Sequence, residues 1–102
     1  MHARVSQYRI RPGKMDEFTA AVDSLIPALH KVAGFRSLLI LRGGEPNKPE
    51  ATAISLWDTV DELRAGDNNV FYYQVLTRLM ACCDGFPSVR EHEVLVSDIP
   101  LR

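Results

Sequence analysis

The sequence lacks the features that mark disulfide-stabilised, secreted and membrane-spanning proteins. It holds two cysteines, and these are the neighbours Cys82 and Cys83. A disulfide between adjacent residues would close a strained ring, so both are predicted to be reduced thiols that fill the core rather than a redox pair. The chain has no apolar run near the roughly 20 residues that a membrane helix needs, and none of signal-peptide length at its start. These absences favour a cytoplasmic protein without a disulfide framework.

Charge of one sign is not concentrated anywhere. Twelve basic and thirteen acidic residues give a formal net charge of -1, so neither nucleic acid nor an anionic membrane is a predicted partner. The histidines His2, His30 and His92 are scattered without the spacing of metal ligands, and no metal site is predicted. The length of 102 residues predicts a single domain that spans residues 1–102.

The first half of the chain contains a regular succession of strand and helix patterns. Arg4 to Arg11 alternates and predicts a strand. Apolar residues at three-to-four spacing then predict an amphipathic helix, kinked at Pro27, that ends at Gly34. The apolar run Phe35 to Leu41 predicts a strand that is covered on both faces. Arg42 to Glu50, rich in glycine and proline, predicts a mobile loop between two hairpin strands.

A strand and a helix start meet at the only tryptophan of the chain. Ala51 to Asp58 predicts the third strand, which carries Trp57 at its end. Thr59 and Glu62 have the spacing of a capping box, in which each side chain takes an unpaired backbone amide at the start of a short helix. Trp57 is therefore predicted to lie at the mouth of the space between sheet and helices.

The second half continues with a long helix and a last strand. Asp67 to Asn69 predicts another helix start, and Val70 to Cys83 predicts a helix with two adjacent apolar stripes. Ser88 to Ser97 alternates and predicts the last strand. The order strand, helix, strand, strand, helix, strand predicts an α+β, ferredoxin-like βαββαβ fold, with the helices on one face of a four-stranded antiparallel sheet. A second copy is predicted to cover the other face and form a dimeric α/β barrel.

Three segments resemble the antibiotic biosynthesis monooxygenase domain family, in the dimeric α/β barrel superfamily. They are the turn Arg11 to Phe18, the strand entry Gly34-Phe35, and Ile54 to Asp58. The likeness extends over nearly the whole chain and implies the fold described above. In the cofactor-free enzymes of this family a bound phenol or quinol is deprotonated, and its electron-rich anion reduces dioxygen directly. The resemblance thus implies a homodimer without a cofactor, an aromatic small molecule and dioxygen as partners, and Trp57 as a pocket residue.

The chain also departs from patterns within this superfamily. Members with assigned polycyclic substrates tend to place an asparagine before the tryptophan and a tyrosine after it, and this chain has Ala53 and Leu63 near those places. Haem-degrading members use a histidine ligand and an asparagine where this chain has Asp67 and Gln7, so haem is not implied. Two hypotheses stay open. One is a cofactor-independent monooxygenase that acts on an aromatic quinol or phenol, and the other is a noncatalytic, small-ligand-binding or stress-responsive dimer.

Five residues are the candidate site residues of the sequence. Trp57 is predicted to contact the substrate and to take part in catalysis, and His92 is a candidate general base. Phe71 and Tyr72, at the start of the second long helix, and Arg9, a candidate for stabilising a phenolate or carboxylate, are predicted to bind the substrate. Each has a structural alternative: core packing for the aromatic residues, a surface salt bridge for Arg9, and a satisfied or dimer-interface histidine for His92.

Overall fold

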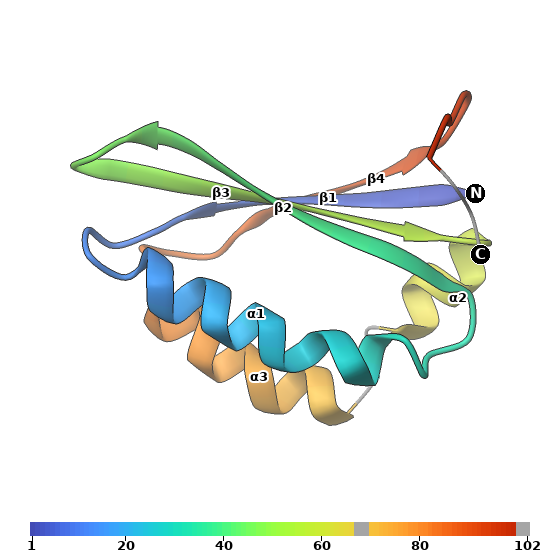
Figure 1. The fold of residues 1–102 in the computed structure, drawn as a ribbon, viewed down its shortest axis with the longest axis horizontal. Coiled ribbons are helices and arrows are strands. Elements are labelled where there is room, and N and C mark those ends of the chain that lie inside the picture. Colours follow the sequence, from blue (N-terminus) through green and yellow to red (C-terminus); the bar gives the residue numbers. More distant parts are fainter. Residues whose placement is uncertain (67–69, 100–102) are drawn as a thin grey trace.

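A four-stranded antiparallel sheet with helices on one face makes up the fold (Figure 1). The computed structural model describes residues 1–66 and 70–99, and the side chains of residues 70–72 lie outside it. The strands, in the sheet order β2-β3-β1-β4, are β1 (His2–Arg9), β2 (Phe35–Glu45), β3 (Lys48–Trp57) and β4 (Ser88–Glu93). The helices are α1 (Met15–Leu29), α2 (Val60–Ala65) and α3 (Val70–Ala81). The predicted α+β, ferredoxin-like fold is confirmed.

The core lies between the sheet and the two long helices. In Figure 1, α1 and α3 run side by side beneath the sheet, and α2 lies at the end of the sheet near the N-terminus. The buried residues of α1 and those of the described part of α3 face this core. The Tyr8 and Phe18 rings pack at its centre with their centroids 5.0 Å apart. The other buried members of the core cluster are Ile10, Ala21, Val22, Leu25, Ala51, Val75, Leu79, Cys82 and Cys83.

The end of α1 differs from the expectation that this helix runs to Gly34. The helix continues past Pro27 as one element and ends at Leu29. Beyond it the backbone N–H groups of Lys31 and Val32 donate to carbonyls three residues back, at 3.1 and 2.9 Å, which tightens the chain into turns. Gly34, with φ of +81°, closes this turn and not the helix.

The expectation of a loop over Arg42 to Glu50 is wrong. The strands β2 and β3 pair through Gly44↔Pro49 and Glu45↔Lys48, which leaves only residues 46–47 between them. Gly44 has φ of +76° and approaches the Lys48 carbonyl, a position that a side chain could not occupy. Glycine and proline here build the tight end of a long hairpin, where composition alone predicted irregular chain.

Two further boundaries differ from expectation. The last strand ends at Glu93 and not at Ser97. Its neighbour β1 begins at His2, the register partner of Glu93, so the pairing cannot extend further. One more backbone hydrogen bond follows, from the Val94 N–H to the Met1 carbonyl at 2.9 Å. The helix start expected at residues 67–69 lies outside the described residues. Within the part of the chain that the structure describes, no helix is long and apolar enough to cross a membrane.

The outer face of the sheet carries no helix (Figure 1). Leu39 and Leu41 of β2 point to this face, and 54% and 44% of their surface is exposed. Ile54 of β3, the cross-strand partner of Leu39, and Val5 of β1, the partner of Ile54, continue the apolar surface. The structure thus leaves an apolar sheet face open, as the sequence predicted.

Candidate functional site

A cavity of about 80 Å³ lies between the inner face of the sheet and the long helices, and Trp57 forms one of its walls. Apolar side chains of the sheet, α1 and α3 make up most of its lining, among them Val22, Leu38 and Leu79. The polar part of the lining among the described residues is Arg4, Ser6, Tyr8 and Ser55. The cavity is therefore an apolar space with a few hydrogen-bonding groups from β1 and β3, the composition of a small-molecule site.

Trp57 is held on three sides. Its side chain is 3% exposed, and the Phe35 ring meets it edge to face with centroids 5.3 Å apart. The indole Nε1 donates to Ser55 Oγ at 3.0 Å. Gly66, the residue after α2, lies so close that a Cβ there would be 2.7 Å from Cη2 of the indole. The tryptophan is thus a fixed wall of the cavity.

The predicted helix start explains why α2 reaches the indole. The Thr59 hydroxyl oxygen accepts a hydrogen bond from the Glu62 backbone N–H at 3.1 Å, as the N-cap of α2. The Glu62 carboxylate accepts from the same hydroxyl at 3.1 Å, a contact that takes the place of the reciprocal backbone bond of a capping box. Because α2 begins directly after β3, its last turn returns over the indole.

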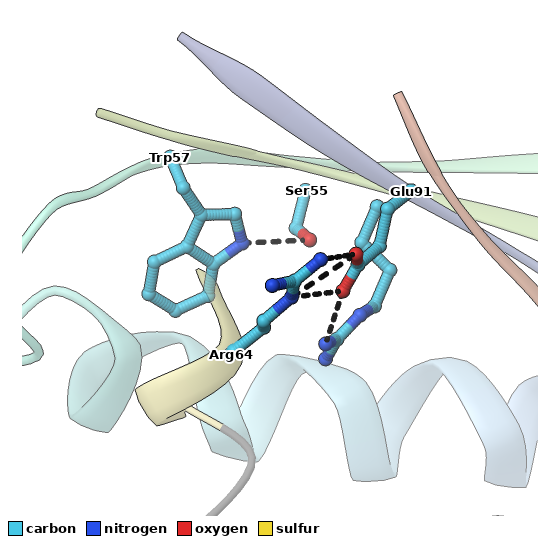
Figure 2. A network of polar contacts seen from close by, with 5 residues as sticks. Ser55, Trp57, Arg64 and Glu91 are labelled. Atoms are coloured by element: carbon cyan, nitrogen blue, oxygen red, sulfur yellow. Dashed lines mark hydrogen bonds and ion pairs between the residues drawn. The ribbon is translucent and has the colours of Figure 1, made fainter. Parts of the chain in front are cut away.

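A carboxylate shared by two arginines stands beside the cavity. Arg64 of α2 donates to Glu91 of β4 from Nη2 at 2.9 Å and from Nε at 3.3 Å, and Arg4 Nη2 of β1 lies 4.0 Å from Glu91 Oε2. Figure 2 shows Arg64 and Glu91 next to the Trp57–Ser55 hydrogen bond. The hydrogen bond from Arg64 and the charges of Arg64 and Arg4 hold the pKa of Glu91 below its ordinary value. None of these three residues is among the site residues predicted from the sequence.

The structure does not bring all predicted site residues together. Trp57 lines the cavity, whereas Arg9 is exposed and alternates in β1 with the buried Tyr8, so it belongs to the opposite face. His92 also lies on that outer face, in a shallow hollow that includes Val5 and Gln7. The backbone of Phe71 and Tyr72 is in the first turn of α3, and their side chains lie outside the described residues. The predicted roles of these four residues stay predictions.

The two thiols are core groups. Cys82 and Cys83 are both free and buried. Burial raises the pKa of Cys83 to about 11, and burial also raises the pKa of Cys82. Since the thiolate is the reactive form, neither residue has the environment of a reactive cysteine.

The fold and the cavity define a ferredoxin-like α+β domain with an apolar cavity between its sheet and its long helices. The sequence model of the antibiotic biosynthesis monooxygenase family matches residues 1–67. The chain therefore belongs to the antibiotic biosynthesis monooxygenase family. No curated protein matches the chain in sequence.

Solved structures share the fold at low sequence identity. SnoaB, a cofactor-independent oxygenase from Streptomyces nogalater, superimposes with a TM-score of 0.73 at 16% identity, over 95% of each chain. A candidate antibiotic biosynthesis monooxygenase from Bordetella bronchiseptica gives 0.78 at 17% identity, over 93% of this chain and 97% of its own. A conserved protein from Methanosarcina mazei gives 0.78 at 19% identity, over 90% and 91%. These similarities show a common fold.

Proposed function

We propose that this protein is a cofactor-independent monooxygenase that acts on an aromatic phenol or quinol. The observation that carries the proposal is the cavity against Trp57, which an apolar wall and a few hydrogen-bonding groups complete. Membership of the antibiotic biosynthesis monooxygenase family supports it. The fold shared with SnoaB, itself a cofactor-independent oxygenase, is consistent with it.

The reaction needs no electron donor besides its substrate. A phenol with a free para position and one dioxygen molecule give a quinone and one water molecule. One oxygen atom replaces the para hydrogen as a carbonyl, and the other leaves as water with the two hydrogens that the ring and the hydroxyl give up. The ring supplies all four electrons. The protein must bind the phenol, favour its ionised form and keep bulk water away from it.

Residues of the cavity fit these three tasks. The indole of Trp57 gives the substrate ring a flat surface to pack against. Arg4, whose side chain is 16% exposed, offers a positive charge to a phenolate. Leucine and isoleucine side chains from the helices and the sheet surround the remaining space and exclude water.

The volume of the cavity limits the size of the ligand that it can hold. An engineered cavity that holds benzene measures about 150 Å³, whereas this one measures about 80 Å³. An aromatic ring therefore enters only when wall side chains move apart, or it leaves part of itself at the mouth. The small volume, and Ala53 in the wall near the place where the family resemblance implies an asparagine, favour a second candidate function. In that case the protein is a noncatalytic dimer that binds a small ligand.

Oxygen uptake separates the two candidates. We expect the purified protein to consume dioxygen with at least one of 1-naphthol, 1,5-dihydroxynaphthalene and anthrone, above the rate of spontaneous oxidation. Trp57→Leu should lower the uptake at least about tenfold through lost positioning of the ring. Phe86→Leu is the control, because Phe86 is 89% exposed. A folded protein that gives no uptake with any of the three would reject the enzyme and leave the ligand-binding dimer.

We propose that two copies of the chain pack through their open sheet faces. The exposed Leu39 and Leu41 and the neighbouring Ile54 support this arrangement, since a large apolar patch is rare on a monomer. We expect a dimer by light scattering at micromolar concentration and a monomer for Leu39→Lys. Phe86→Lys, which adds the same charge at an exposed residue outside the strands, should stay dimeric. A monomeric wild-type protein would contradict the proposal.

A further inference from the structure

A second hollow lies on the outer face of the sheet, away from the Trp57 cavity. The helices and the cavity lie on the other side of the sheet (Figure 1). This outer hollow measures about 320 Å³, and its described lining is Val5 and Gln7 of β1 with Ser88, Arg90 and His92 of β4. The reaction proposed above uses none of these residues. A ligand of the outer hollow is therefore separate from the substrate of the cavity.

The alternation of β4 sorts its charged side chains between the two faces. Successive residues of a strand point to opposite faces, so Arg90 and His92 share the outer face, and Glu91 and Glu93 share the inner one. On the inner side the Glu91 carboxylate accepts from Arg64 of α2 at 2.9 Å. Both basic residues of β4 thus stand on the face that its acidic residues leave.

The register of β1 and β4 places further hydrogen-bond donors beside Arg90. Val5 is the direct partner of Arg90 and Gln7 is the partner of Ser88, so the Gln7 amide lies diagonally across from Arg90. A hydroxyl, an amide and a neutral imidazole each have a hydrogen to donate. The described lining of the outer hollow contains no carboxylate. The hollow is therefore a cluster of donors around one positive charge.

Two other arginines of the chain have a carboxylate partner, Arg36 with Asp58 and Arg64 with Glu91. Among the described residues, none forms an ion pair with Arg90. A guanidinium only donates hydrogen bonds, and an anion with several oxygens accepts from it and from its neighbours at the same time. Since one water molecule occupies about 30 Å³ of the liquid, the outer hollow has room for such an anion and part of its hydration shell.

We propose that the outer hollow binds a tetrahedral oxyanion, a phosphate or sulfate group, on Arg90, with Gln7 and His92 as further donors. The shared chemistry is a compact group with several charged oxygens, either as the free ion or as the ester of an organic ligand. The hollow lies at the β4 edge of the sheet, and the exposed leucines that support the dimer lie on β2, at the opposite edge. The inference rests on neither the proposed reaction nor the proposed dimer.

Calorimetric titration with simple anions tests this inference. Sodium phosphate, sodium sulfate and sodium chloride are added to the purified protein at equal ionic strength, so that general screening by salt is the same in each experiment. We expect phosphate and sulfate to bind at least about tenfold tighter than chloride, because they accept several charge-assisted hydrogen bonds at once. Equal heats for the three salts, or no saturable binding of phosphate and sulfate, would overturn the inference.

Variants assign the binding to the outer hollow. Arg90→Gln should weaken phosphate at least about fivefold, whereas Arg42→Gln, which removes the same charge from an exposed arginine of β2 outside the hollow, should leave the affinity unchanged. Gln7→Glu should also weaken phosphate, since it places a carboxylate of nearly the same shape beside Arg90. Equal losses for Arg90→Gln and Arg42→Gln would assign the binding to general surface charge and overturn the inference.

A phosphate ester separates the two sources of the anion. Glycerol 2-phosphate carries the same charged group on an organic ligand. Tighter binding of this ester than of inorganic phosphate assigns an ester, weaker or equal binding assigns the free ion, and both results support the inference. Oxygen uptake without binding of phosphate or sulfate would reject this inference alone, and anion binding without oxygen uptake would reject the proposed enzyme alone.

Discussion

The contact between Gly66 and the indole makes Gly66→Ala an informative change. Gly66 has φ of -60° and ψ of -25°, a backbone conformation that alanine adopts without strain. The added methyl group would lie 2.7 Å from Cη2 and 3.3 Å from Cζ2 of Trp57. Because carbon atoms do not approach so closely, either α2 or the indole must move.

The magnitude follows from two opposing effects. Overpacking a filled interior costs about 1–3 kcal/mol, and the Trp57 ring cannot turn aside easily, since Phe35 and Ser55 hold it. Replacing glycine by alanine at a compatible backbone position stabilises by about 0.4–1 kcal/mol through the unfolded chain. We therefore expect Gly66→Ala to lower the free energy of unfolding by about 0–2.5 kcal/mol, and to change the emission of Trp57 and the affinity of the cavity for 1-naphthol.

Urea unfolding and ligand titration measure both effects. Gly43→Ala is the matched control, because nothing lies within 4 Å of a Cβ at Gly43, and its stability and 1-naphthol affinity should stay near those of the wild type. Gly66→Ala with raised stability, unchanged emission and unchanged 1-naphthol affinity would refute the close contact between α2 and the indole.

Three further predictions concern the cap, the thiols and the shared carboxylate. Thr59→Ala should cost about 1 kcal/mol in urea unfolding through the lost N-cap. Thr19→Ala, a half-buried position inside α1 whose hydroxyl donates only to the Asp16 carbonyl one turn back, should cost less, and equal costs would argue against the cap. A pKa of Cys83 raised from 9.0 to about 11 predicts reaction with Ellman's reagent about 100-fold slower in the folded than in the unfolded protein, and equally fast reaction would contradict it. The lowered pKa of Glu91 stabilises the protein above the unfolded value of about 4.3, and this contribution is lost as the pH falls through the lower folded pKa. The stability difference between wild type and Glu91→Gln should therefore shrink from pH 7 toward about pH 3, and a constant difference in thermal melts would be the opposing result.

The fold was largely predictable because its elements carry strong periodic patterns. Three-to-four spacing marked α1 and α3, and the spacing of Thr59 and Glu62 located the start of α2. The predicted β2–β3 hairpin is present, and the main error was the long loop expected at its end, since glycine and proline are as compatible with a tight strand end as with a loop. The strands extend to the tight turn because Gly44 pairs with Pro49 across the hairpin, and such a pairing cannot be recognised from the local sequence of either strand.

The candidate site was less predictable than the fold. Trp57 was located because it ends a strand just before a capped helix. The Arg4–Glu91–Arg64 cluster comes from two strands and a helix that are far apart in sequence, and only the β1–β4 register brings Arg4 opposite Glu91. Arginines occur on both faces of β1, and Arg9 was predicted to bind the substrate because the strand pattern alone does not say which face looks toward the helices. The inward direction of Ser6 and Tyr8 settles this for Arg4.

The most direct test of the account is oxidation of 1-naphthol under ¹⁸O₂, with mass spectrometry of the product. The proposed reaction predicts a quinone that carries a single ¹⁸O atom, formed faster than without protein and much more slowly by Trp57→Leu. No product above the spontaneous background, or equal rates for the wild type and Trp57→Leu, would contradict a monooxygenase that works at the Trp57 cavity.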